Sequence, residues 1–187
     1  FRLFRFYRLH IPPRFSAAVI LLPDRGRYGM ITVNLVYPAG GAAMTIVFVC
    51  TGNTCRSPMA AALMRQVLDK RGRRDIMVTS AGLAAAAGQP AARHAVEAMR
   101  ECGADLSAHR ARPIDDTLLC GADCFAVMSA SHAAALAAYG VPPERVHVLA
   151  AQSGGIPDPY GGSLDDYRRT RDILKDAVEA LAAQCRL

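Results

Sequence analysis

Short apolar runs alternate with longer segments of helical periodicity from residue 44 to the end of the chain. The apolar runs are rich in β-branched or aromatic residues and predict strands. They are continuous rather than alternating, as is typical of strands that are covered on both faces of a sheet. Four such strands are expected, at residues 45–49, 76–79, 124–128 and 146–149.

Helices are predicted between these strands, and turn-forming residues mark their ends. Ser57 can cap the first helix, Pro58 fits its first turn, and Gly72 ends it. Four more helices are expected, at residues 90–102, 113–119, 129–139 and 163–183. Strands that alternate with helices form a parallel sheet with helices on both faces. The prediction is one three-layer α/β domain over residues 44–187, with a four-stranded parallel sheet.

The composition is that of a globular protein, and its positive charge is unevenly distributed. Of the 187 residues, 52% are apolar and 20% are charged, which suits one domain with a buried core. The net charge is +6, but residues 1–43 carry six arginines against one aspartate and so supply +5 of it. The rest of the chain is close to neutral, and we therefore expect no nucleic-acid partner.

Residues 1–43 differ in pattern from the rest of the chain. The chain begins with Phe1, and Met44 opens the first well-patterned segment. The apolar run at residues 17–22 is shorter than the core of a signal peptide or a membrane span. We expect a mistaken upstream gene start or a disordered extension, and a functional basic arm is the third explanation. No membrane partner is expected, and the predicted location is the cytoplasm.

The cysteines outside residues 50–57 show no metal-binding pattern. Zinc sites usually combine closely spaced cysteine pairs with a second pair or with histidines further along the chain. No such histidine pair follows Cys120 and Cys124. We expect these four residues to be reduced, small core residues of a cytosolic protein, with no metal and no cofactor: Cys102, Cys120, Cys124 and Cys185.

A loop that follows the first strand has the features of an anion site. Ligands of parallel sheets bind beyond the carboxyl ends of the strands. Cys50 and Arg56 frame five residues, a length that can curl its backbone N–H groups around an anion. Gly52 allows a close approach or a positive φ, and the next helix adds its N-terminal dipole. Because Arg56 also offers a fork of donors, the loop predicts a phosphate site.

The same loop suggests covalent chemistry. A helix N-terminus and a guanidinium favour the thiolate form of a cysteine, so Cys50 is the candidate nucleophile for attack on phosphorus. Ser57 can donate a hydrogen bond to the departing thiolate. Asp158 stands between two prolines in an extended loop and is the candidate general acid. Asp165 and Asp166 are rivals, but acidic residues are expected in the first turn of the last helix.

Three motifs resemble the low-molecular-weight protein tyrosine phosphatase family. They are the ten residues 49–58 (Val-Cys-Thr-Gly-Asn-Thr-Cys-Arg-Ser-Pro), the Ser-Ala-Gly at 80–82 and the Asp-Pro-Tyr at 158–160. The resemblance covers residues 44–183 and implies Cys50 as nucleophile, Arg56 as phosphate clamp and Asp158 as general acid and later base. Together with the loop geometry, it gives the predicted substrate- and phosphate-binding residues: Thr51, Gly52, Asn53, Thr54, Cys55, Ser57 and Tyr160.

The resemblance also implies supporting roles around the loop. Asn53 would keep the loop in shape through a polar network, with His109 as its candidate partner. Cys55 matches a second loop cysteine that is thought to protect the nucleophile through a reversible disulfide. The other histidines of residues 44–187 are interpreted as packing or surface residues: His94, His132 and His147.

The predicted substrate depends on Thr51. Tyrosine-specific members of the family usually carry an aliphatic residue there and a second aromatic residue after the one at Tyr160. This chain has Thr51 and Gly161, and in both it resembles the bacterial protein-arginine phosphatases of the family. A hydroxyl could contact the guanidinium group of phosphoarginine, and a site built for a polar group discriminates well. Alternatively, Thr51 only bonds the loop backbone.

Phosphoarginine in a protein is therefore the favoured substrate, and phosphotyrosine is the alternative. Arsenate reduction on the same fold would need a second cysteine pair to relay a disulfide, and Cys120 with Cys124 is the candidate pair in sequence. A module that only binds phosphoproteins would be expected to lack the nucleophile or the acid, and both are present. The oligomeric state is open, with a monomer favoured.

Overall fold

The computed structural model describes residues 17–24, 27–34 and 44–187. The chain divides into two compact units, Phe1–Gly41 and Ala42–Leu187. In the first unit, strands β1 (Ala17–Asp24) and β2 (Arg27–Asn34) pair antiparallel, with Ala17 opposite Asn34. Sequence analysis did not predict this hairpin. A mistaken gene start or a disordered extension was expected for residues 1–43. Apart from the two strands, this segment consists of residues 1–16, 25–26 and 35–43, which lie outside the described residues.

The second unit contains the predicted four-stranded parallel sheet. Its strands are β3 (Met44–Cys50), β4 (Ile76–Gly82), β5 (Cys124–Val127) and β6 (Val146–Val148). All neighbours are parallel, and the strand order is β4-β3-β5-β6. The register places Cys50 opposite Gly82, so the loop after β3 leaves the sheet beside the end of β4.

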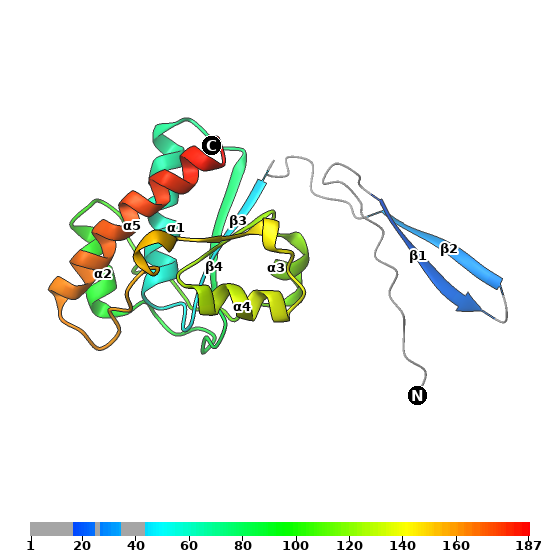
Figure 1. Ribbon diagram of the computed structural model, residues 1–187, viewed down its shortest axis with the longest axis horizontal. Helices are drawn as coiled ribbons and strands as arrows, with labels where there is room; N and C mark the ends of the chain where they lie inside the picture. Colours follow the sequence, from blue (N-terminus) through cyan, green and yellow to red (C-terminus); the bar gives the residue numbers. More distant parts are fainter. Residues whose placement is uncertain (1–16, 25–26, 35–43) are drawn as a thin grey trace. The chain divides into compact units, whose positions relative to one another are not determined.

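Helices cover both faces of this sheet, as predicted. Figure 1 shows α1, α2 and α5 on one side of the strands and α3 and α4 on the other. Two short 3₁₀ turns flank β6, at Pro143–Arg145 and Ala151–Ser153. The helices are α1 (Arg56–Lys70), α2 (Arg93–Arg100), α3 (Asp116–Gly121), α4 (Ala130–Ala138) and α5 (Leu164–Gln184).

Helix α2 is shorter than the predicted segment at residues 90–102. Pro90 lies in an isolated antiparallel bridge with Arg110, so the chain is extended there and the helix begins at Arg93. The bridge brings the segment before α2 beside the segment before α3. This pairing depends on two distant stretches of chain, which helical periodicity does not reveal.

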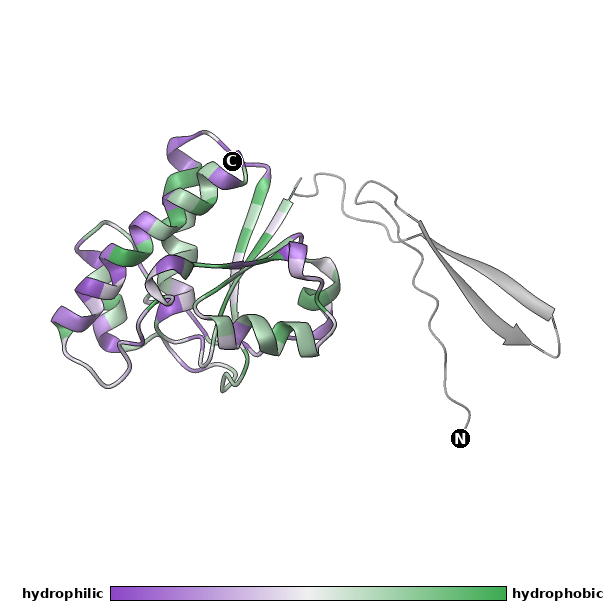
Figure 2. Cartoon of the chain, in the orientation of Figure 1, coloured by the Kyte–Doolittle hydropathy of each residue, from purple (hydrophilic) through white to green (hydrophobic). Residues whose placement is uncertain are grey.

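The continuous apolar run of β3 supplies side chains to two separate cores. Ile46 and Phe48 belong to the core under α1 and α5, whereas Val47 and Val49 belong to the core under α3 and α4. All four are fully buried. Figure 2 shows hydrophobic residues along β3 and β4, and hydrophilic residues concentrated in the first turns of α5. Burial on both faces explains why this strand does not alternate.

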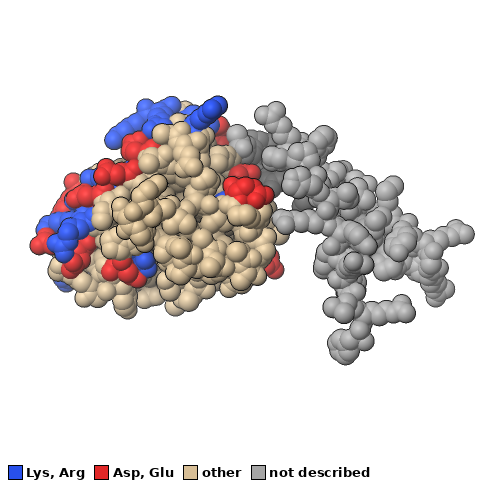
Figure 3. Space-filling model, in the orientation of Figure 1, with Lys and Arg blue, Asp and Glu red and all other residues tan. Residues whose placement is uncertain are grey.

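The charged side chains of the second unit include both acidic and basic groups. On the face shown in Figure 3, acidic and basic groups are interspersed over α2 and α5, and a large area over α4 carries few charges. None of the helices in the described part of the chain combines the length and the apolar character needed to cross a membrane.

Candidate active site

The loop that begins at Cys50 lies directly against the end of β4. A Cβ atom added to Gly82 would come within 2.6 Å of the Thr51 carbonyl oxygen and 2.9 Å of the Asn53 nitrogen. Real Cβ atoms do not approach backbone atoms so closely. The glycine that ends the Ser-Ala-Gly motif therefore allows the loop to curl over this strand.

Asn53 is at the centre of a hydrogen-bond network that holds the loop. Its Nδ2 donates to Ser57 Oγ and to Ser80 Oγ, each at 2.9 Å. Its Oδ1 accepts from the Arg112 backbone N–H at 2.9 Å, and its carbonyl oxygen is bonded to His109 Nε2 at 2.7 Å. The structure therefore brings His109 to the loop, where sequence analysis expected it. Burial lowers the pKa of His109 and favours the neutral ring.

The left-handed residue of the loop is Asn53 and not Gly52. Asn53 has a φ of 53°, whereas Gly52 is absent from the residues with positive φ. A Cβ atom on Gly52 would meet only Thr54 Oγ1, at 3.7 Å. Of the two roles expected for Gly52, a close approach or a positive φ, the structure shows no positive φ. Asparagine tolerates this conformation, and the hydrogen bonds of Asn53 hold it there.

The Cys50 thiol points into the loop. Its Sγ lies 2.9 Å from Ser57 Oγ and accepts the Asn53 backbone N–H at 3.3 Å. Helix α1 begins at Arg56 with Cys55 as N-cap, so the prediction of Ser57 as the helix cap was wrong. Ser57 is buried in the first turn because its hydroxyl serves Cys50 and Asn53 instead.

Arg56 is held from two directions at the mouth of the loop. Its Nη1 donates to the Ile156 carbonyl oxygen at 3.3 Å, and its Nη2 donates to Asp158 Oδ2 at 2.5 Å. The Arg56 side chain is 8% exposed, whereas that of Asp158 is 50% exposed. The ion pair brings the predicted clamp and the predicted acid together, although 102 positions separate them.

The loop that carries Asp158 is fixed at both of its ends. At its start, Gly155 has a φ of 100°, and an added Cβ would lie 2.5 Å from the Met128 carbonyl oxygen. That oxygen accepts the Ile156 N–H at 2.8 Å. At its end, Ser163 and Asp166 form a reciprocal capping box at the start of α5. The carboxylate of Asp158 therefore projects from a loop whose two ends are anchored.

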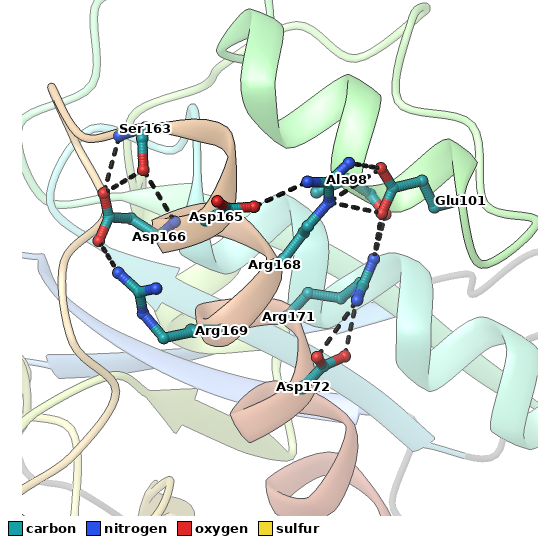
Figure 4. Close-up of polar contacts among 9 residues, drawn as sticks. All are labelled: Ala98, Glu101, Ser163, Asp165, Asp166, Arg168, Arg169, Arg171 and Asp172. Atoms are coloured by element: carbon teal, nitrogen blue, oxygen red, sulfur yellow. Dashed lines mark hydrogen bonds and ion pairs between the residues drawn. The ribbon is translucent and has the colours of Figure 1, made fainter.

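The rival aspartates serve the first turn of α5, as sequence analysis expected. Figure 4 shows Asp166 bonded to Ser163 and paired with Arg169, and Asp165 paired with Arg168. Arg168 also donates to the carboxylate of Glu101 at the end of α2, and the same carboxylate accepts a hydrogen bond from Arg171. These two arginines lower the pKa of Glu101 to about 2. The network therefore connects the start of α5 to the end of α2.

A pocket of about 260 Å³ opens over the loop. The structure brings most of the predicted site residues to its wall, while Asn53 and Ser57 lie buried behind it. Tyr160 is 75% exposed and lies at the rim. Gln89 also lines the pocket and was missed, because nothing in its local sequence distinguishes it. The full lining is Cys50, Thr51, Gly52, Thr54, Cys55, Arg56, Gln89, Asp158 and Tyr160.

His132 was also missed, and it contacts the site through Thr51. Its Nε2 is hydrogen bonded to Thr51 Oγ1 at 3.0 Å, and its Nδ1 to Ser129 Oγ at 2.6 Å. Burial, together with the nearby Arg56 charge, lowers the pKa of His132. Sequence analysis interpreted His132 as a packing or surface residue; it is buried, and it also bonds the Thr51 side chain. Its position just after β5, the neighbour of β3, was the available signal.

Cys55 lies in the pocket wall with its thiol turned toward α5. Its Sγ is hydrogen bonded to the buried Tyr167 hydroxyl at 3.2 Å and lies 3.6 Å from Thr54 Oγ1. Burial raises the pKa of the Cys55 thiol, and the Tyr167 hydroxyl opposes that shift. Two thiols of different environment, Cys50 and Cys55, therefore share one small pocket.

Comparison with known proteins identifies the family. Residues 45–186 match the model of the family described as low molecular weight phosphotyrosine protein phosphatase. The chain belongs to this family. It is accordingly a cysteine-based low-molecular-weight protein phosphatase, a hydrolase that acts on phosphorylated proteins.

Members of the family with several different activities are similar to this chain. The protein-arginine-phosphatase of Bacillus subtilis is 39% identical, over 75% of this chain and 96% of its own length. A probable low molecular weight protein-tyrosine-phosphatase of Ralstonia nicotianae is 35% identical, over 76% and 96%. Arsenate reductase 1 of Staphylococcus epidermidis is 33% identical, over 74% and 95%.

A solved structure of the family is similar in fold as well. A mutant of the YwlE arginine phosphatase superposes with a TM-score of 0.71 at 37% identity, over 76% of this chain and 96% of its own. In that structure the active-site serine is phosphorylated.

Proposed function

We propose that this phosphatase hydrolyses phosphoarginine in proteins through a phosphocysteine at Cys50. The observation that carries the proposal is the hydrogen bond between Thr51, which lines the pocket, and the buried His132. The names of two similar proteins, the protein-arginine-phosphatases of Bacillus subtilis and Geobacillus stearothermophilus, support the same substrate.

The first step transfers the phosphoryl group to the protein. The loop amides and the Arg56 fork would hold the phosphate oxygens above the Cys50 sulfur. The thiolate attacks phosphorus, the new S–P bond forms, and the P–N bond to the arginine breaks. Ser57 Oγ, 2.9 Å from the sulfur, is placed to stabilise the thiolate when it departs in the second step.

Asp158 would supply and recover the proton. In the first step its carboxyl group protonates the leaving nitrogen, and in the second it takes a proton from the water that attacks phosphocysteine. A P–O bond forms, the S–P bond breaks, inorganic phosphate is released, and the Cys50 thiolate is regenerated. The phosphate of a substrate competes with Asp158 for Arg56, so substrate binding would release the carboxyl group toward the leaving group.

Thr51 and His132 would select the leaving group. A neutral His132 can accept the Thr51 hydroxyl proton at Nε2, which leaves the hydroxyl oxygen free to accept an N–H from the substrate. A guanidinium group offers such donors, whereas the aromatic ring of phosphotyrosine offers none. The bond to His132 also argues against Thr51 serving only the loop backbone.

The alternative substrates fit the pocket less well. Phosphotyrosine would find an aromatic partner in Tyr160 at the rim, but its ring offers no N–H donor to the Thr51 hydroxyl oxygen, whose hydrogen bond would remain the one to His132. Arsenate reduction needs thiols that relay a disulfide from the loop. Cys120 is exposed on α3, and Cys124 begins β5, at the end of the sheet away from Cys50.

A direct comparison of substrates tests the proposal. The full chain should be assayed with one peptide that carries either phosphoarginine or phosphotyrosine at the same position. We expect a higher kcat/KM for the phosphoarginine peptide. A higher value for the phosphotyrosine peptide would make this chain a tyrosine phosphatase of the same family.

A further inference from the structure

Three side chains with metal-binding atoms meet away from the phosphate loop. The sulfur atoms of Cys124 and Cys185 and a ring nitrogen of His147 all lie within 4.8 Å of one another. Cys124 is the first residue of β5, His147 is the middle residue of β6, and Cys185 caps the end of α5. The cluster therefore joins two neighbouring strands to the last helix.

The sheet register explains why these residues meet. Cys124 and Ala126 both belong to the core under α1 and α5, and Ala126 pairs with His147. Paired residues of adjacent strands point to the same face, so His147 faces the same helices as Cys124. Cys185 packs against that core from the end of α5. No spacing rule along the sequence connects these positions.

The environment of the three groups suits a soft cation. Among the described residues, the His147 ring makes no hydrogen bond. Cys124 is buried, whereas His147 and Cys185 are half-buried, which gives an ion a path to the cluster.

The spacing is close to that of a zinc site. With Zn–S bonds of about 2.3 Å and Zn–N bonds of about 2.0 Å, tetrahedral ligand atoms lie roughly 3.3 to 3.8 Å apart. The three ligand atoms lie within 4.8 Å of one another in the structure, so small side-chain rotations would bring them to these distances. Cysteine and histidine are also the ligands that a thiophilic divalent cation prefers over calcium or magnesium.

We propose that Cys124, His147 and Cys185 form a zinc site that connects the end of α5 to the sheet. Binding forms two Zn–S bonds and one Zn–N bond, and each thiol releases one proton to solvent. Water completes the tetrahedron. Cys124 pairs with Ile46, four residues before Cys50 on β3, so the site lies roughly 13 Å along the strand from the nucleophile. The ion would therefore stabilise the fold and take no part in phosphoryl transfer.

Cobalt titration of the reduced full chain tests the site. The titration is done with Cys50→Ser and Cys55→Ser in place, because the loop thiols could also bind metal. We expect one equivalent of Co²⁺ to bind, with thiolate-to-cobalt charge-transfer absorption, tetrahedral d–d bands and release of protons, and Zn²⁺ should displace it. Saturating Zn²⁺ should also raise the Tm.

Variants of the three cluster residues distinguish metal binding at this site from metal binding by other cysteines. Cys124→Ala and Cys185→Ala should each abolish the charge-transfer band, whereas Cys102→Ala and Cys120→Ala should leave it unchanged. If a core variant fails to fold, His147→Gln on the edge strand replaces it and should weaken Co²⁺ binding by more than about tenfold. Lack of binding by the reduced protein, or binding that survives these substitutions, would overturn the proposal.

Discussion

The Thr51 hydroxyl is hydrogen bonded to His132 Nε2 at 3.0 Å, and this contact sets the polarity of one pocket wall. His132 is buried and is held on its other side by Ser129 Oγ at 2.6 Å. Because burial lowers the pKa of His132, its ring is neutral at physiological pH and can accept the Thr51 proton. The Thr51 oxygen then keeps a lone pair with which it can accept a further hydrogen bond.

Replacement of Thr51 should change substrate preference. Thr51→Ile keeps the nucleophile, the clamp and the acid, but removes the hydroxyl and adds apolar bulk. Loss of a hydrogen bond to a charged group costs about 1.5 to 3 kcal/mol, so kcat/KM for phosphoarginine should fall about 10- to 100-fold. Phosphotyrosine turnover should be kept or increased. Thr51→Ser is the matched control and should retain the preference, and an unchanged ratio in Thr51→Ile would mean that Thr51 only braces the loop.

Cys50→Ser should remove turnover and leave anion binding. The Arg56 fork and the loop amides remain in this variant, so phosphate and vanadate should still bind, which calorimetry can measure. Arg56→Lys should lose both turnover and tight binding, because one ammonium group cannot replace a bidentate fork. Substantial turnover by Cys50→Ser would exclude a phosphocysteine intermediate.

Asp158→Asn should slow the reaction according to the leaving group. For a leaving group that must be protonated, we expect kcat to fall about 10²- to 10⁴-fold. For an activated aryl phosphate, which departs as a stable anion, the loss should be much smaller. The variant also breaks the ion pair to Arg56, so its phosphate affinity serves as the control. Equal losses for both substrates would indicate a structural role.

Peroxide should convert the two pocket thiols to a disulfide. Oxidation of the Cys50 thiolate gives a sulfenic acid, and attack by the Cys55 sulfur forms the S–S bond and releases water. Thiol reductants should then restore activity. In Cys55→Ser the loss should become irreversible, whereas Cys102→Ser should recover like the native protein. Tyr167→Phe should slow disulfide formation, because the Tyr167 hydroxyl favours the Cys55 thiolate. Full recovery by Cys55→Ser would refute the switch.

Two histidines, the half-buried His109 and the buried His132, should make the fold less stable in acid. The pKa values of His109 and His132 are lowered in the folded state, mainly by burial. The unfolded chain therefore binds the additional protons first, and stability falls as the pH drops below about 6.5, the unfolded value. The free energy of unfolding, measured with urea at pH 8 and at pH 5.5, should decrease more between these pH values for the native protein than for the double variant His109→Gln/His132→Gln. Parallel losses in the two proteins would contradict this assignment.

The sequence by itself determined the architecture of the body and the centre of the site. Its continuous apolar runs are the strands of the parallel sheet, because a strand buried on both faces has no polar side. The phosphate-binding loop from Cys50 to Arg56 could also be predicted, since its nucleophile, glycine and arginine are close together in the sequence. Asp158 was identified from its prolines and from family resemblance.

Only the tertiary structure decided which distant side chains complete the site. Gln89 and His132 reach the loop because neighbouring parallel strands end at one edge, and no local pattern marks either residue. Asn53 takes the left-handed conformation that Gly52 could have supplied, and it is held there by hydrogen bonds to Ser80 and to the segment of His109 and Arg112. Periodicity and spacing report what neighbours in sequence do, whereas these contacts join residues that only folding brings together.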